Sequence, residues 1–184
     1  DLGPKLPSLL KFIKQISTGK TKDYLLKNFK FEAEIEKTGK VSDILNSNQH
    51  ILVQVVKEPI STKGPRISSE LSLAGRYMVL VPFSDRISIS QKIEDREEKN
   101  RLKRLVQSIR PKNFGVIIRT VAQDKKVAEL DADLQQLLTR WKKMCASLSK
   151  INKYPTKVLS EINRSSSILR DIFDDSFTGI HVDD

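Results

Sequence analysis

The stretch VKEPISTKGPRISSELSLAGRYMVLVP, residues 56–82, decides how the rest of the chain is interpreted. It continues the β-branched run at 51–56, which predicts a strand. The Ser-Thr-Lys-Gly-Pro segment at 61–65 predicts a turn, and the alternating apolar positions of 67–73 predict a half-exposed strand. A third apolar run at 77–83 follows an Ala-Gly pair. This part of the chain is therefore expected to be rich in strands, with a basic turn between the first two.

Working outward from this stretch, helices and strands mix toward the C-terminus. Leucines and a tryptophan recur at helical spacing over 127–148, with Trp141 on the buried side, so we expect a long amphipathic helix. The other elements expected are a strand at 86–90, a helix at 97–109, a strand at 114–122, a helix at 165–173 and a strand at 178–182. This mixture predicts the α+β fold class.

The first fifty residues give weaker signals. Apolar residues at helical spacing over 9–16 predict a helix, and Ser8 is the candidate N-cap. Residues 17–38 mix lysines with isolated aromatics and predict a long loop, and 41–45 predict a short helical turn.

Composition narrows the function classes. Lys and Arg number 33 against 23 Asp and Glu, a formal net charge of +10, which favours a polyanionic partner such as nucleic acid over an ordinary basic surface. The single cysteine, Cys145, excludes an internal disulfide, and with two distant histidines, His50 and His181, it cannot complete a structural zinc site. No apolar run approaches the ~20 residues of a membrane span, and no signal peptide opens the chain. We therefore expect a cytoplasmic protein that does not enter the membrane.

No catalytic constellation is visible in the sequence. Two acidic pairs, Asp174-Asp175 and Asp183-Asp184, have the chemistry to bind a divalent metal ion. The alternative, which we favour, is that they are a helix-end charge and a strand end. We therefore expect neither a catalytic residue nor a metal ligand in this chain.

Candidate binding residues are basic. Arg119 and Thr120 follow an apolar strand, so a guanidinium and a hydroxyl project from a rigid element and could bind a phosphate group. Gly75 would allow backbone N–H groups to approach the same phosphate closely. The physical pattern alone favours the alternative, a surface arginine at a strand end and an ordinary turn glycine. Lys57 and Lys63 flank the basic turn and suit contact with an RNA backbone, or belong to a solvated hairpin tip.

Aromatic residues in the strand runs have two interpretations. Tyr77 and Phe83 could stack on bases, but aromatic residues in such runs more often fill a core. We expect these two residues, and Trp141, to be core residues.

The ordered strand, basic turn, Ala-Gly pair and Arg-Thr pair together resemble the ribonuclease E/G family of bacterial endoribonucleases, and especially its ribonuclease G type from the Bacteroidetes group. The resemblance covers most of the chain and is strongest over 51–141. It implies that residues 1–72 are the later part of an S1 RNA-binding domain with OB-like strands. It further implies that 73–160 are a 5′-sensor domain and that 161–184 begin an RNase H-like segment that is cut short.

The same resemblance assigns roles to particular residues. It implies that Gly75, Val79, Arg119 and Thr120 bind the 5′ monophosphate of single-stranded RNA, and that Lys57 and Lys63 contact RNA. A further sensor arginine of the family falls near Gln91 here, where Lys92 could substitute. The family's Mg²⁺-binding catalytic aspartates and zinc-binding cysteines would lie outside these 184 residues. The resemblance therefore implies a fragment, taken from a homo-oligomeric enzyme of RNA processing and decay, that binds RNA without cutting it.

Two other functions stay open. A stand-alone basic RNA-binding module of S1 type would be indifferent to the 5′ group, and a scaffold that binds an acidic protein would not bind RNA at physiological salt. Only about two strands of a five-stranded S1 barrel are visible. We therefore expect the N-terminal part to be rearranged, paired with another chain or held by its helix.

Overall fold

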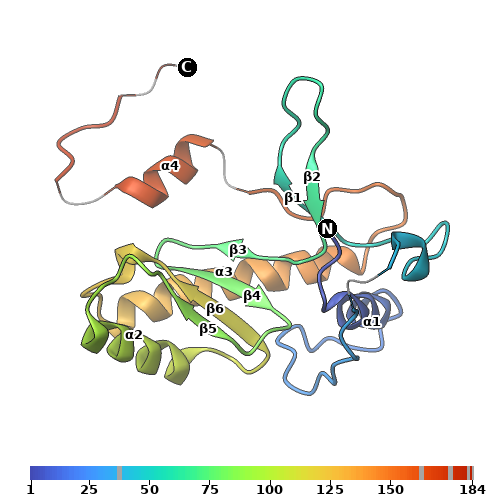
Figure 1. Cartoon of the computed structure of the whole chain (residues 1–184), viewed down its shortest axis with the longest axis horizontal. Coiled ribbons are helices and arrows are strands. Elements are labelled where there is room, and N and C mark those ends of the chain that lie inside the picture. The colour runs from blue at the N-terminus through green and yellow to red at the C-terminus, as the bar shows by residue number, and fades with distance from the viewer. Residues whose placement is uncertain (37–38, 162–163, 174–175, 182, 184) are drawn as a thin grey trace.

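A computed structural model of the chain describes residues 1–36, 39–161, 164–173, 176–181 and 183. It contains a four-stranded sheet in the order β3-β4-β6-β5 and a separate two-stranded sheet, β1-β2 (Figure 1). The strands are β1 Gln54–Lys57, β2 Arg66–Ser68, β3 Leu73–Ala74, β4 Met78–Pro82, β5 Ile87–Ile89 and β6 Phe114–Ile118. The helices are α1 Leu6–Ser17, α2 Arg96–Ile109, α3 Val127–Leu148 and α4 Arg164–Ile172. Short 3-10 turns, η1 Val41–Asp43 and η2 Thr120–Ala122, complete the α+β fold.

The four-stranded sheet is mixed. Strand β4 pairs antiparallel with β3 and with β6, whereas β5 pairs parallel with β6 through the α2 crossover. Helices α2 and α3 contact each other and cover one face, α2 against β5 and α3 against β3 and β4. The alternation in β4 follows from this cover: Met78, Leu80 and Pro82 are buried, whereas Val79 and Val81 are only half-buried. The sheet therefore has one closed face and one partly open face.

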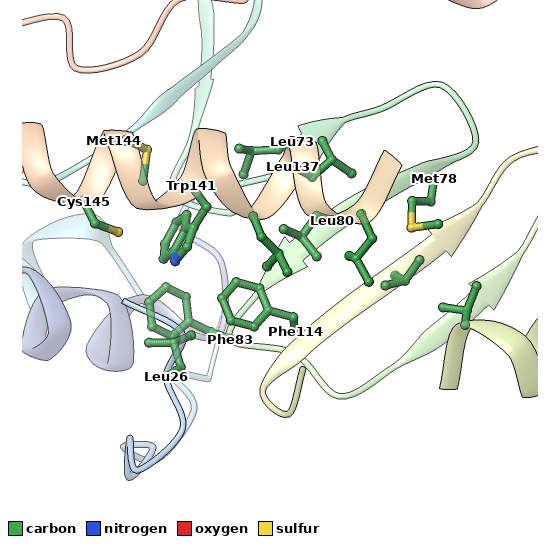
Figure 2. Close-up of a cluster of buried hydrophobic side chains, with 14 of the residues drawn as sticks. Leu26, Leu73, Met78, Leu80, Phe83, Phe114, Leu137, Trp141, Met144 and Cys145 are labelled. Atoms are coloured by element: carbon green, nitrogen blue, oxygen red, sulfur yellow. The ribbon is translucent and has the colours of Figure 1, made fainter. Parts of the chain in front are cut away.

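The core is built around Trp141 of α3 (Figure 2). Its ring stacks on Phe12 of α1 and meets Phe83 and Phe114 edge-on, at centroid distances of 5.9, 6.0 and 5.8 Å. The indole N–H donates to the backbone carbonyl of Tyr24. The N-terminal helix is thus held to the same core as the four-stranded sheet.

Several expected elements are confirmed, with shifted ends. Helix α3 has the predicted bounds, and α2, α4, β4, β5 and η1 lie where their patterns placed them. Phe83 and Trp141 are core residues as predicted, whereas Tyr77 is only half-buried.

Five sequence expectations are wrong in whole or in part. The strand expected at 67–73 is divided between β2 and β3, which belong to different sheets, and β1 begins only at Gln54. The strand expected at 114–122 ends at Ile118, and its last residues form η2. Residues 178–181 form no strand, and residue 182 lies outside the described residues. Ser8 is not a cap but a buried residue inside α1, whose hydroxyl accepts the N–H of Glu32 at 3.0 Å.

The division of 67–73 has a physical cause. Ser69 and Glu70 turn away from β2 because Ser69 bonds to the N-terminal segment: its N–H donates to the carbonyl of Asp1, and its hydroxyl accepts the N–H of Gly3. The proposed boundary between an S1-like part ending at residue 72 and a sensor beginning at 73 coincides with the passage between the two sheets. The domain division itself stays a prediction.

Candidate functional site

The candidate phosphate site lies where the turn between β3 and β4 meets the end of β6. We use this name for Gly75, Val79, Arg119 and Thr120. The N–H of Gly75 donates to the carbonyl of Met78 at 2.8 Å and closes the turn. Val79 lies in β4 opposite Ala74 of β3 on one side and Ile117 of β6 on the other. Arg119 leaves β6 with its N–H bonded to the carbonyl of Tyr77 at 2.9 Å.

Arg119 has a defined position in this site. Its Nη1 donates to the carbonyl of Gly75 at 2.9 Å and to Oδ1 of Asp171 at 2.7 Å. The hydrogen bond and charge of Asp171 raise the pKa of Arg119 despite its partial burial. Among the described residues, no partner lies within hydrogen-bonding distance of its Nε or Nη2. The guanidinium is therefore anchored through one nitrogen and keeps a two-nitrogen edge that can grip a phosphate.

Thr120 lies beside Arg119 at the start of η2. Its hydroxyl is 2.9 Å from the hydroxyl of Ser90, the residue that follows β5, and either oxygen can be the donor. Gln91 and Lys92 come directly after Ser90 and are exposed. The structure thus brings the segment in which the resemblance expects a further basic residue next to the Arg-Thr pair.

A buried carboxylate shapes the glycine turn. Asp133 of α3 is 8% exposed and accepts the backbone N–H groups of Arg76, Tyr77 and Met78 at 3.0, 2.9 and 3.2 Å. A Cβ added to Gly75 would lie 2.5 Å from this carboxylate. Residue 75 is therefore a glycine because the carboxylate occupies the space of a side chain. The N–H groups of the turn serve Asp133, and Gly75 contributes its carbonyl as a support for Arg119.

More arginines surround the turn. Nη1 of Arg140 in α3 and Nη1 of Arg170 in α4 both donate to the carbonyl of Ala74 at 3.2 Å, and both pair with Glu161 at 3.1 and 3.4 Å. The guanidinium of Arg76 donates to the carbonyl of Phe173. The turn thus lies among four arginines, counting Arg119, and three carboxylates, Asp133, Glu161 and Asp171.

Lys57 and Lys63 lie elsewhere. Both are exposed in the β1-β2 hairpin, which projects away from the four-stranded sheet (Figure 1). Lys57 pairs with Arg66 across the hairpin, and the backbone of Lys63 pairs with Ile60 at its tip. The structure therefore brings Gly75, Val79, Arg119 and Thr120 together and leaves the two lysines on a separate sheet.

Sequence reasoning missed Asp133, Asp171, Arg140, Arg170 and Ser90. Asp133 had a detectable signal, because it interrupts the apolar face of α3 between Leu130, Leu134 and Leu137. Nothing in the sequence marked Asp171, because only the fold brings α4 against the turn.

Among the described residues, neither the acidic groups nor the cysteine forms a metal or nucleophilic site. In the part of the chain that the structure describes, no group of three or more His, Cys, Asp or Glu side chains could hold a metal ion. Asp174, Asp175 and Asp184, three of the four acidic residues discussed above, lie outside the described residues. Cys145 is buried, which raises the pKa of its thiol well above its ordinary value and makes it a poor nucleophile. None of the helices in the described ranges is both long and apolar enough to span a bilayer.

Comparison with known proteins decides the family. Residues 72–184 match the model of the Ribonuclease E/G family. The chain belongs to the ribonuclease E/G family. It is 36% identical over 149 residues to Ribonuclease G of Haemophilus influenzae, covering 80% of this chain and 30% of the relative. It is 33% identical over 145 residues to Ribonuclease E of Synechocystis sp., covering 79% of this chain and 21% of the relative.

This family member spans only part of its curated relatives, between 21% and 30% of the length of the two compared above. Ribonuclease G of Escherichia coli gives the same result, with 34% identity over 78% of this chain and 29% of the relative. Among solved structures, the RNase P protein of Staphylococcus aureus aligns over 38% of this chain and 79% of its own, at 24% identity and a TM-score of 0.32, too low to indicate a shared fold. The expected family is thus confirmed by sequence.

Proposed function

We propose that this chain is the RNA-binding, 5′-end-sensing part of a single-strand-specific endoribonuclease of RNA processing and decay. The observation that carries the proposal is the anchored guanidinium of Arg119, whose Nε and Nη2 have no hydrogen-bond partner among the described residues and which precedes Thr120 in the chain. A terminal phosphate monoester offers several charged oxygens to one bidentate arginine, whereas a 5′ hydroxyl offers a single uncharged oxygen. The site therefore suits RNA that carries a 5′ monophosphate.

The hairpin supports a second, less selective contact. Lys57 and Lys63 are exposed on a sheet that does not share the candidate phosphate site, so they suit the phosphates of the RNA backbone. In this proposal the hairpin contributes affinity and the Arg119 site contributes the preference for a 5′ end. Hydrolysis with Mg²⁺, and a zinc-linked homo-oligomer, would be properties of the whole protein that draw on residues outside this chain.

Fluorescence anisotropy with one short single-stranded RNA tests the proposal. The RNA carries a 5′ monophosphate, a 5′ hydroxyl or a 5′ triphosphate, and the full 184-residue chain is compared with Arg119→Ala and with Arg104→Ala. Arg104 is exposed on α2 and is not one of the residues of the candidate phosphate site, so its variant loses the same charge elsewhere on the surface. We expect the monophosphate RNA to bind about tenfold or more tightly than the hydroxyl RNA, and Arg119→Ala alone to abolish the difference.

Equal binding of the three RNAs by the unmodified chain would support the alternative, a basic RNA-binding module of S1 type without end sensing. Absence of binding at physiological salt would support a scaffold for an acidic protein. A preference that persists in Arg119→Ala would place the sensor elsewhere.

A further inference from the structure

Helix α4 contributes an acidic residue to the surroundings of Arg119. Asp171 accepts a hydrogen bond from Nη1 of Arg119 at 2.7 Å through Oδ1, and the same oxygen accepts Nε of Arg170 at 3.0 Å. A carboxylate beside a phosphate site normally repels the ligand, so its presence needs an explanation.

We propose that Asp171 is the positioning residue of the candidate phosphate site, and that the docking of α4 completes this site. The inference rests on the function proposed above. Nη1 of Arg119 carries two hydrogens, and its two acceptors are the carbonyl of Gly75 and the carboxylate of Asp171. With both hydrogens used, the planar guanidinium cannot rotate without breaking a charge-assisted bond. Its Nε–Nη2 edge is thereby held in one orientation for a phosphate.

The position of Asp171 is itself fixed from two directions. Arg170 holds the Asp171 carboxylate through Nε and the carbonyl of Ala74 through Nη1 at 3.2 Å, and its Nη2 donates to Ser167 at 3.1 Å. Ala74 and Gly75 are consecutive residues of the turn. Arg170 therefore ties α4 directly to the carbonyl of Ala74, and Asp171 ties it through Arg119 to the carbonyl of Gly75.

Asp171 has two opposing effects on phosphate binding, one through its charge and one through its hydrogen bond. Its negative charge weakens the attraction of Arg119 for a phosphate, whereas its hydrogen bond removes the freedom of a long side chain before the ligand arrives. We expect the second effect to dominate for end selectivity, because Asp171 is 35% exposed and solvent screens its charge. The same solvent weakens the direct hydrogen bond between Asp171 and Arg119 less than it weakens the repulsion between Asp171 and a phosphate.

The test measures end selectivity and not affinity alone. The ratio of the dissociation constants for 5′-hydroxyl and 5′-monophosphate RNA is determined for the full chain, Asp171→Ala, Asp171→Asn and Asp131→Ala. Asp131 of α3 bonds only to Gln135 at 3.1 Å among the described residues, so its variant matches the change in charge. We expect the ratio to fall about tenfold in Asp171→Ala, to recover in part in Asp171→Asn, and to stay unchanged in Asp131→Ala.

Three outcomes would overturn the inference. A ratio that rises in Asp171→Ala would make Asp171 a competitor of the phosphate and not a support of Arg119. A ratio that is unchanged in Asp171→Ala while Arg119→Ala abolishes it would refute the role of Asp171 and leave the proposed function standing. If the ratio of dissociation constants is unchanged in Arg119→Ala, the proposed function is wrong, and the inference that rests on it falls with it. A matching far-ultraviolet circular dichroism spectrum shows that each variant is folded, and if Asp171→Ala does not fold, the first two outcomes are judged from Asp171→Asn.

Discussion

At the scale of single residues, the buried carboxylate of Asp133 and the missing side chain of Gly75 depend on each other. Asp133 satisfies three consecutive backbone N–H groups of the turn from inside the fold. A carboxylate with little exposure is tolerated because these bonds replace its water. The absence of a side chain at Gly75 leaves room for it. The pair fixes the carbonyl of Gly75, on which Arg119 depends.

Replacing Gly75 by alanine should therefore destabilise the fold and the site together. The added Cβ would meet Asp133 at 2.5 Å, and the carboxylate cannot retreat without losing its three bonds. We expect a loss of about 1–3 kcal/mol in the free energy of unfolding, measured by urea titration. Gly64→Ala is the control, since nothing among the described residues lies within 4 Å of its added Cβ, and it should change stability by less than about 0.5 kcal/mol. Equal effects at both positions would contradict the argument.

At the scale of elements, sequence periodicity correctly predicted those helices and strands whose positions depend on the local sequence alone. The apolar stripe of α3, the run of β4 and the helix expected at 97–109 all gave correct elements. The pattern over 67–73 failed, because two hydrogen bonds to the N-terminal segment divide it: the N–H of Ser69 donates to Asp1, and the hydroxyl of Ser69 accepts the N–H of Gly3. The candidate site shows the same limit. Family resemblance supplied Arg119 and Gly75, whereas Asp171 reaches them only through the docking of α4.

The docking of α4 should depend on pH in the acid range. Hydrogen bonds from Arg119 first, and also from Arg170, lower the pKa of Asp171 to about 2. A depressed pKa means that the folded state favours the charged carboxylate, so the contribution of Asp171 is fully present above its ordinary pKa of about 4 and is lost as the pH falls toward 2. We expect the backbone amide NMR signals of 164–172 to shift between about pH 4 and about pH 2. The Asp171→Asn variant should lack this transition. A wild-type transition centred near pH 4 would show that Asp171 is not paired.

At the scale of the whole molecule, one core carries two surfaces of different kind. Helix α1 packs its Phe12 on Trp141 of α3. Strand β4 also packs on α3, and Phe114 of β6 meets the same tryptophan ring, so the candidate phosphate site belongs to a rigid body. The β1-β2 hairpin has almost no buried residues of its own, Ser68 being the exception. Rigid positioning suits recognition of one terminal group, whereas an exposed basic hairpin suits contact with any stretch of RNA backbone. The formal net charge of +10 attracts the RNA polyanion to both surfaces.

This division predicts that affinity and end selectivity can be separated. Replacing Lys57 and Lys63 together by glutamine should weaken binding of 5′-monophosphate and 5′-hydroxyl RNA by the same factor. It should also reduce the slope of log affinity against log salt by about 0.7 for each backbone phosphate that loses its lysine, because fewer counterions are released. Anisotropy titrations at several salt concentrations give both quantities. The Lys142→Gln, Lys143→Gln double variant removes the same charge from exposed positions of α3 and should leave the slope nearer the wild-type value. Loss of end selectivity in the hairpin variant would show that the two surfaces act as one site, since a purely backbone-phosphate contact cannot distinguish a 5′ phosphate from a 5′ hydroxyl.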